Sequence, residues 1–290
     1  MGRVSIKALT KIGIVLEMIK FEHTVFALPF ALTSALVAAR GLPDWRTLGW
    51  ILVAMVGARS AAMAFNRIAD MRLDAMNPRT ADRALPRGLV SVSVAWAIVA
   101  VSAGMLVAAA YMLNPLAFAL SPVALLAVMT YSYSKRFTSL SHVWLGLCLG
   151  IAPVGAWIAV KGTIAWPPLV LSAAVMLWTA GFDIIYSLQD LDFDRRIGLA
   201  SLPARIGAGR ALAVSRLFHF AAVGLLISFG AMCGLGVLYY TGVALAAACL
   251  FYEQSIVSAD DISRVNTAFF TANGFVSLAV FVFVAADVML

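Results

Sequence analysis

Residues 48–74 read LGWILVAMVGARSAAMAFNRIADMRLD, an apolar run that ends in a short polar segment. In that segment an amide and two carboxylates, Asn66, Asp70 and Asp74, stand at positions i, i+4 and i+8. On a helix these positions share one face, and at about 1.5 Å rise per residue they extend over roughly 12 Å. A ladder of oxygen atoms at the end of a hydrophobic span suits a divalent cation that carries a phosphate.

The composition excludes a soluble fold. Of the 290 residues, 63% are hydrophobic and only 12% are charged, whereas soluble domains have about 25% charged residues. We therefore expect a polytopic membrane protein in which residues 1–290 form a single domain. The three cysteines lie in apolar runs without a CxxC motif, which favours small core residues over a redox or metal site. The basic N-terminal residues are not followed by a cleavage site, so we expect no removable signal peptide.

Nine apolar stretches of about 17–24 residues are expected to cross the membrane as helices. They are residues 24–40, 47–65, 90–112, 114–132, 141–160, 166–187, 211–231, 233–252 and 268–289. Turn signals such as Gly41-Leu42-Pro43 and Asn114-Pro115 separate them. The expected fold is an all-α bundle of nine transmembrane helices.

The basic residues sort by side of this bundle. Seventeen of the 21 fall at the N-terminus or in loops after the even-numbered spans, three fall on the other side, and Arg59 lies within the second span. The positive-inside rule then puts the even-numbered loops in the cytosol and the C-terminus outside, as in the inner membrane of a prokaryotic cell. The same rule explains the net charge of +7, so no nucleic-acid partner is expected.

Half of the acidic residues gather in two stretches on the cytosolic side, after the second span and around the end of the sixth. These seven of 14 are Asp70, Asp74, Asp82, Asp183, Asp190, Asp192 and Asp194. Like charges at i, i+4 destabilise a helix unless a cation neutralises them. We therefore expect two Mg²⁺ ions, one held by Asn66, Asp70 and Asp74 and one by Asp190 and Asp194, bridged by a diphosphate. The alternative is that each cluster is a solvated loop paired with nearby arginines.

Basic side chains near both clusters suit the same ligand. Arg79 and Arg83 follow the first cluster, and Tyr131, Lys135 and Arg136 end the fourth span. Guanidinium and ammonium groups hold diphosphate oxygens and offset the charge of a departing pyrophosphate. Taken singly, each base also fits an ordinary cytoplasmic anchor.

Arg59 lies seven residues before Asn66, two turns deeper on the same helical face and roughly 10 Å closer to the bilayer centre. A buried arginine implies a pocket and an anionic partner. We expect that partner to be the carboxylate of an acceptor substrate; snorkelling or pairing with Asp183 is the alternative. Arg67 and Arg72 are expected to point away from the Asn66–Asp74 face.

In chain order, these residues form four motifs. Asn66, Asp70 and Asp74 match an NDxxDxxxD-like pattern with Arg67 in place of the usual aspartate, and Arg79 and Arg83 belong to an RTxxRPLPxG-like segment. A YxxxKR-like helix end and a DxxYxxxDxxxD-like motif follow, formed by Tyr131, Lys135, Arg136, Asp183, Tyr186, Asp190 and Asp194. The ordered set resembles the UbiA superfamily of intramembrane prenyltransferases over nearly the whole chain.

The resemblance implies a cytosol-facing cavity that opens sideways to lipid. Mg²⁺ and the bases would assist departure of diphosphate from a polyprenyl diphosphate, with Asp70, Asp74, Asp190, Asp194 and Lys135 as catalytic residues. The allylic cation would alkylate a small aromatic carboxylate bound by Arg59, Asp183 and Tyr186, and the ring would then lose a proton. Such chemistry requires charge stabilisation and exclusion of water, and no obligate protein partner is expected.

The segment Lys20-Phe21-Glu22-His23-Thr24 departs from the Arg-Xaa-Asp-Lys/Arg-Pro pattern of many aromatic prenyltransferases in the family. Together with the residues after it, it is similar to the 4-hydroxybenzoate polyprenyltransferase subgroup, some members of which serve menaquinone synthesis through a dihydroxynaphthoate acceptor. Other acceptors, such as 1,4-dihydroxy-6-naphthoate, stay open. His23 fits either a polar cavity contact or an interfacial residue. The rival class is a carrier for an anionic amphiphile.

Overall fold

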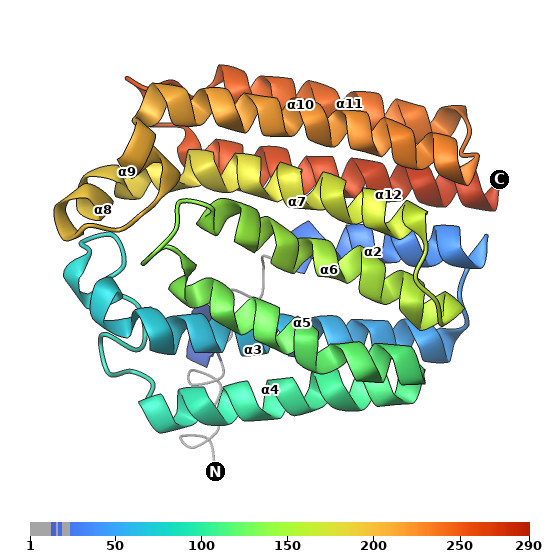
Figure 1. Ribbon diagram of the computed structural model, residues 1–290, viewed down its shortest axis with the longest axis horizontal. Coiled ribbons are helices and arrows are strands. Elements are labelled where there is room, and N and C mark those ends of the chain that lie inside the picture. The colour runs from blue at the N-terminus through green and yellow to red at the C-terminus, as the bar shows by residue number, and fades with distance from the viewer. Residues whose placement is uncertain (1–12, 16, 19–23) are drawn as a thin grey trace, which may run out of the picture.

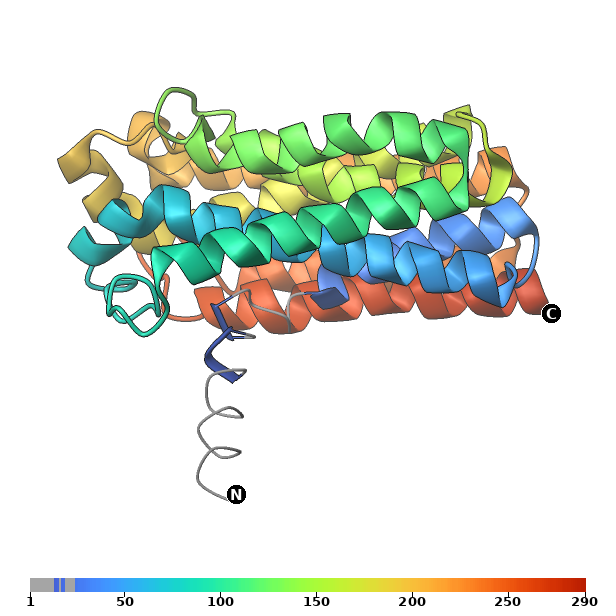
Figure 2. The same cartoon turned by 90° about the horizontal axis from the view of Figure 1, so that it is seen from below.

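The structure is a computed structural model that describes residues 13–15, 17–18 and 24–290. In this part of the chain, nine helices of 16 residues or more run along the long axis of the molecule (Figures 1 and 2). They are α2 (Thr24–Ala39), α3 (Trp45–Met76), α4 (Val92–Leu113), α5 (Pro115–Ser134), α6 (Ser141–Lys161), α7 (Trp166–Ser187), α10 (Ala208–Cys233), α11 (Val237–Ser255) and α12 (Asn273–Met289). Each expected apolar stretch is a helix, so the all-α prediction is confirmed. His23 lies outside the described residues.

Seven of these helices are long and apolar enough to cross a membrane, α12 together with the turn Thr267–Ala272 that precedes it, which makes the chain a multi-pass integral membrane protein. The two others fall short for different reasons. The 16 residues of α2 span about 24 Å, less than the roughly 30 Å of a bilayer core. Helix α11 ends in the polar residues Glu253, Gln254 and Ser255.

Helix α3 extends beyond the expected apolar span 47–65, because it continues through the polar residues after 65 to Met76. Asp44 caps its start by accepting a hydrogen bond from the backbone N–H of Thr47 at 2.9 Å. The backbone N–H of Asn77 closes its end on the carbonyls of Leu73 and Asp74. The whole Asn66–Asp74 segment is therefore helical, and the expected one-face arrangement of its oxygens holds.

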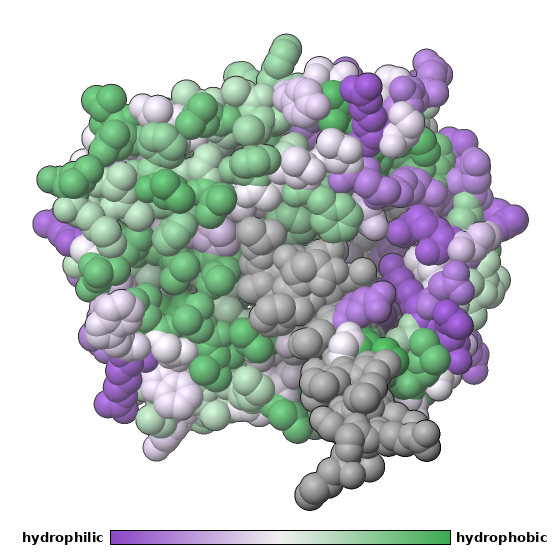
Figure 3. Space-filling view, turned by 180° about the vertical axis from the view of Figure 1, so that it is seen from behind, coloured by the Kyte–Doolittle hydropathy of each residue, from purple (hydrophilic) through white to green (hydrophobic). Residues whose placement is uncertain are grey.

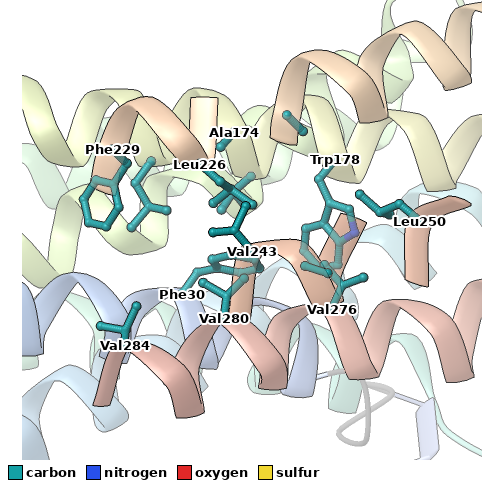
Figure 4. Close-up of a cluster of buried hydrophobic side chains, with 14 of the residues drawn as sticks. Phe30, Ala174, Trp178, Leu226, Phe229, Val243, Leu250, Val276, Val280 and Val284 are labelled. Carbon is teal, nitrogen blue, oxygen red and sulfur yellow. The ribbon is translucent and has the colours of Figure 1, made fainter. Parts of the chain in front are cut away.

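The helices pack in two groups. Helix α3 packs most closely on α4, and α5 joins this pair to α6. The remaining helices close a ring in which α2 lies between α6 and α12, and α7 between α6 and α10. The main apolar core fills this ring, with Phe30, Trp178 and Phe229 among its buried side chains (Figure 4).

One polar network interrupts that core. Asn273 is fully buried and accepts a hydrogen bond from Trp178 Nε1 at 2.7 Å. Its amide donates to Glu253 Oε1 and to the carbonyls of Ala268 and Phe269, in the π-helical turn η3 (Thr267–Ala272) that leads into α12. π-Helical turns often lie at functional sites, and Phe269 in η3 lines the cavity described below.

The two ends of the bundle differ. Helix α7 is followed by the 3₁₀ turn η2 (Leu188–Asp190) and the short helices α8 (Leu191–Ile197) and α9 (Leu202–Ile206), which lie at the left of Figure 1. Gly198 ends α8 with a φ of 76°, a left-handed conformation that suits glycine. In Figure 3, seen from behind, apolar side chains cover much of the face to the left of the grey atoms, and polar ones gather most densely at this same end, on the right of that view.

Candidate functional site

A cavity of about 700 Å³ lies between α3, α4, α5, α6 and α7. Its deeper walls are apolar, with Ile51, Leu113 and Ile158 among the lining residues. Of the 13 site residues predicted from the sequence, twelve line this cavity and Arg136 does not. The fold therefore brings together segments that are more than 100 residues apart in the chain.

The first acidic cluster lies on α3. Asp70 is buried, and its two carboxylate oxygens contact Lys135 Nζ at 3.1 Å and Arg136 Nη2 at 3.2 Å. Asn66, one turn earlier, donates from Nδ2 to Asp70 Oδ2 at 3.2 Å. Arg136 reaches Asp70 from outside the cavity, with its guanidinium 4.9 Å from the ring centre of Tyr133. Both bases at the end of α5, Lys135 and Arg136, thus form ion pairs with the Asp70 carboxylate.

Asp74 is held by bases as well, but incompletely. Its Oδ1 accepts a hydrogen bond from Arg83 Nη1 at 2.7 Å. Its Oδ2 is buried and has no hydrogen-bond partner among the residues that the structure describes, and Arg67 Nη1 lies 4.0 Å from it. Since a buried polar atom without a partner is costly, this oxygen is suited to a further ligand.

Arg67 corrects one expectation. It is buried, lines the cavity and donates from Nε to the carbonyl of Met18 at 3.1 Å. The prediction that it points away is wrong, because residues 67 and 74 are seven apart and so lie on nearly the same helical face. Arg72 is exposed and outside the cavity lining, as expected.

The second acidic cluster is joined to the segment after α3 by hydrogen bonds and an ion pair. Asp190 accepts hydrogen bonds at Oδ1 from Asn77 Nδ2 at 2.8 Å and from Arg79 Nε at 2.9 Å, and it forms an ion pair with Arg79. Burial disfavours the charged guanidinium of Arg79, but the bonds to Asp190 outweigh this and raise its pKa. Asp194 in α8 is buried and lines the cavity. The two acidic clusters therefore meet at one end of one cavity.

The residues predicted to bind an acceptor line the same cavity. Arg59 is half-buried, Asp183 pairs with His142, and Tyr186 accepts a hydrogen bond from Arg79 Nη1 at 3.1 Å. The ring of Tyr186 lies against that of Phe269, with centroids 4.2 Å apart. His142 and Asn77 were not among the predicted residues.

The donors at this end fit magnesium. Mg²⁺ takes oxygen ligands, and it is usually bound through one or two carboxylates together with substrate phosphates and water. Within the described residues, no three His, Cys, Asp or Glu side chains are grouped closely enough to hold a metal by themselves. The carboxylates of Asp70, Asp74, Asp190 and Asp194 nevertheless line one cavity, and one oxygen of Asp74 has no hydrogen-bond partner in the described part of the chain. This pattern suits an ion that arrives with a diphosphate.

Solved structures share this fold. The apo structure of a UbiA homologue from Aeropyrum pernix K1 matches with a TM-score of 0.84 and 39% identity, covering 92% of this chain and 98% of that one. A homologue from Archaeoglobus fulgidus, bound to DMAPP and Mg²⁺, matches with a TM-score of 0.76 over 94% of this chain and 98% of that one. Its identity is 18%, so this second likeness concerns the fold.

Fold and cavity define an integral membrane prenyltransferase. The chain belongs to the UbiA prenyltransferase family, which it matches over residues 27–278. It is 33% identical over 252 residues to the 4-hydroxybenzoate octaprenyltransferase of Vibrio cholerae, covering 86% of this chain and 87% of that protein. The corresponding protein of Aliivibrio salmonicida is 32% identical over 257 residues, with 88% of each covered.

Proposed function

We propose that the protein transfers a polyprenyl group from an allylic polyprenyl diphosphate to a carboxylated phenol such as 4-hydroxybenzoate, in ubiquinone or menaquinone biosynthesis. The observation that carries this proposal is that both acidic clusters, together with Arg79, Arg83 and Lys135, line one end of a cavity whose remaining walls are mostly apolar. The polar end suits a diphosphate, and the apolar remainder suits an isoprenoid chain.

In this proposal residues 1–290 form one domain of nine membrane-crossing helices, including α2 and α11, and the cavity opens sideways to lipid for the prenyl tail. Seventeen of the 21 basic residues fall on the side of the bundle that also carries both acidic clusters, so the positive-inside rule supports a cytosolic site and an external C-terminus. This orientation suits the inner membrane of a prokaryotic cell.

Asn66, Asp70 and Asp74 would hold one Mg²⁺ ion, and Asp190 and Asp194 a second. Bound magnesium would supply positive charge to the diphosphate oxygens as negative charge develops on them. Binding of the metal and diphosphate would exchange the present ion pairs, so that Arg79, Arg83 and Lys135 turn from carboxylates to phosphate oxygens. Tyr131 and Arg136 would support this arrangement.

The proposed prenyl transfer is a substitution in which a ring carbon of the acceptor replaces the diphosphate. The allylic C–O bond breaks, diphosphate leaves with the bonding electrons, and a carbon of the electron-rich ring forms the new C–C bond. The ring then loses a proton and becomes aromatic again. The chain supplies electrostatic stabilisation of the leaving group and an apolar wall that keeps water from the cation.

A carrier for an anionic amphiphile is the candidate from another class. Transporters place their substrate and ion sites near the bilayer midplane, whereas here the charged residues gather at one end of the cavity. This distribution favours the enzyme.

The deciding experiment assays the purified protein with one polyprenyl diphosphate and two acceptors, 4-hydroxybenzoate and 1,4-dihydroxy-6-naphthoate, in parallel. We expect Mg²⁺-dependent formation of prenylated 4-hydroxybenzoate, identified by mass spectrometry. Turnover of the naphthoate alone would transfer the proposal to that acceptor. Uptake of the diphosphate into vesicles without any prenylated product would support the carrier.

A further inference from the structure

His142 is a cavity residue to which no motif of the chain assigns a role. It is the second residue of α6, is 4% exposed and lines the cavity. Its Nδ1 lies 2.7 Å from Oδ2 of Asp183, near the C-terminal end of helix α7. Its Nε2 lies 3.3 Å from the backbone nitrogen of Leu202, the first residue of α9.

These two contacts fix the tautomer of the imidazole. A backbone N–H can only donate, so Nε2 accepts from Leu202 and carries no proton. The ring proton then resides on Nδ1 and is donated to the Asp183 carboxylate. Asp183 is thus held as an acceptor by a neutral histidine, an arrangement in which a hydrogen bond orients a carboxylate.

The same hydrogen bond leaves one oxygen of Asp183 available. In the described part of the chain, Oδ1 of Asp183 has no hydrogen-bond partner, while the side chain is 18% exposed and lines the cavity. A carboxylate oxygen in this setting accepts a hydrogen bond from a hydroxyl group. The aromatic acceptor of the proposed function carries such a group.

We propose that His142 is a positioning residue of the acceptor site: through its Nδ1–H it holds Asp183 so that the free carboxylate oxygen accepts the phenolic O–H of the acceptor ring. This inference rests on the proposed function and adds to it a source of selectivity for hydroxylated rings. Because Leu202 follows closely on α8, His142 also connects the acceptor site to the segment that carries Asp194.

Two substitutions separate the two contacts of His142. In His142→Asn, the amide nitrogen stands near the place of Nδ1 and keeps the donor to Asp183. In His142→Gln, the side-chain oxygen can still accept from Leu202 near the place of Nε2, but the donor to Asp183 is lost. His142→Leu removes both contacts and keeps the volume.

The test measures KM for 4-hydroxybenzoate, KM for the polyprenyl diphosphate, and Ki for benzoate, which lacks the hydroxyl. We expect His142→Gln and His142→Leu to raise the acceptor KM by about 10- to 100-fold, the effect of losing a hydrogen bond to a charged group. The donor KM should stay unchanged, the Ki for benzoate should change little, and His142→Asn should remain within about threefold of the wild type. A purely structural role of His142 would change all of these constants together.

Equal impairment of His142→Asn and His142→Leu, or an equal rise in both substrate KM values, would overturn the proposal. If His142→Leu does not fold, Asp183→Asn provides the second arm: it should raise the acceptor KM similarly, and His142→Gln should add little to it in the double variant. Additive effects would again overturn the proposal. Absence of any product from the wild type would refute the proposed function instead. Failure of the proposed function is therefore seen in the wild type, and failure of the His142 proposal is seen in the variants.

Discussion

Replacing Gly57 by alanine should force α3 away from α4. A Cβ atom added at Gly57 would lie 2.7 Å from the carbonyl oxygen of Ser102 and 2.8 Å from the backbone nitrogen of Leu106. Ordinary contact needs about 3.5 Å, so the two backbones must separate by about 0.8 Å. Neither atom belongs to a flexible side chain, and overpacking of this kind costs about 1–3 kcal/mol. Arg59 and Asn66 lie further along the same helix and would move with it.

The matched control is Gly49→Ala, in the same helix, where an added Cβ meets nothing within 4 Å. Alanine is favoured over glycine in a helix by about 1 kcal/mol, so this variant should be neutral or slightly stabilised. Relative to it, Gly57→Ala should unfold roughly 4–8 °C lower in thermal denaturation of the detergent-solubilised protein. Its kcat/KM should fall by about 10- to 100-fold, because a displacement near 1 Å is enough to disturb reactive geometry. Equal unfolding temperatures and activities for the two variants would refute this account of the α3–α4 contact.

Two further predictions concern the charged residues. Arg59→Ala should raise the acceptor KM by at least about tenfold, the loss expected when a buried charged hydrogen bond is removed, with a smaller effect on the donor KM; equal effects on both would argue against a carboxylate-binding role. Lys135→Met should lower kcat by about 100-fold or more in steady-state assays, because Lys135 lines the cavity beside Asp70. Arg136→Met should lower it less, since Arg136 contacts Asp70 from outside the cavity lining; the reverse order would contradict the proposed placement of the diphosphate.

The sequence predicts the elements of this protein well because its signals are local. Apolar stretches of membrane-spanning length correspond to the long helices, and the i, i+4, i+8 spacing of Asn66, Asp70 and Asp74 places them on one face of α3. The motifs identify twelve cavity-lining residues because the fold gathers the polar residues of α3, α5 and α7 at one end. The expected apolar span ends at residue 65 because hydropathy falls there, whereas α3 continues to Met76 through the polar segment whose i, i+4, i+8 spacing indicates a helix.

The contacts between distant segments were less predictable. His142 and Asp183 are 41 residues apart, and only the close packing of α6 on α7 makes them a pair. Asn77 reaches Asp190 across 113 residues. Arg67 is different, since its seven-residue separation from Asp74 was visible in the sequence and indicates a shared face. Arg136 lies outside the cavity lining because it follows Lys135 by one residue, and neighbouring positions at a helix end point in different directions.

The ion pairs of the two clusters can be explained in two ways. Solvated carboxylates paired with arginines would give Arg83–Asp74 and Arg79–Asp190 contacts and nothing more. A diphosphate site would use the same pairs to neutralise its acids before the metal and substrate bind. The two interpretations differ in the response of the protein to divalent metal.

That response tests the account most directly. Pyrophosphate release from a polyprenyl diphosphate in the presence of acceptor should be abolished by EDTA and restored by Mg²⁺ in the wild type. It should fall by at least about 1,000-fold in Asp70→Ala and Asp190→Ala, which remove charges placed to hold the ion and its diphosphate. Asp192→Ala is the matched control, because Asp192 is exposed and outside the cavity lining, and it should keep its activity. Metal-independent release, or full activity in a folded Asp70→Ala or Asp190→Ala variant, would contradict the account.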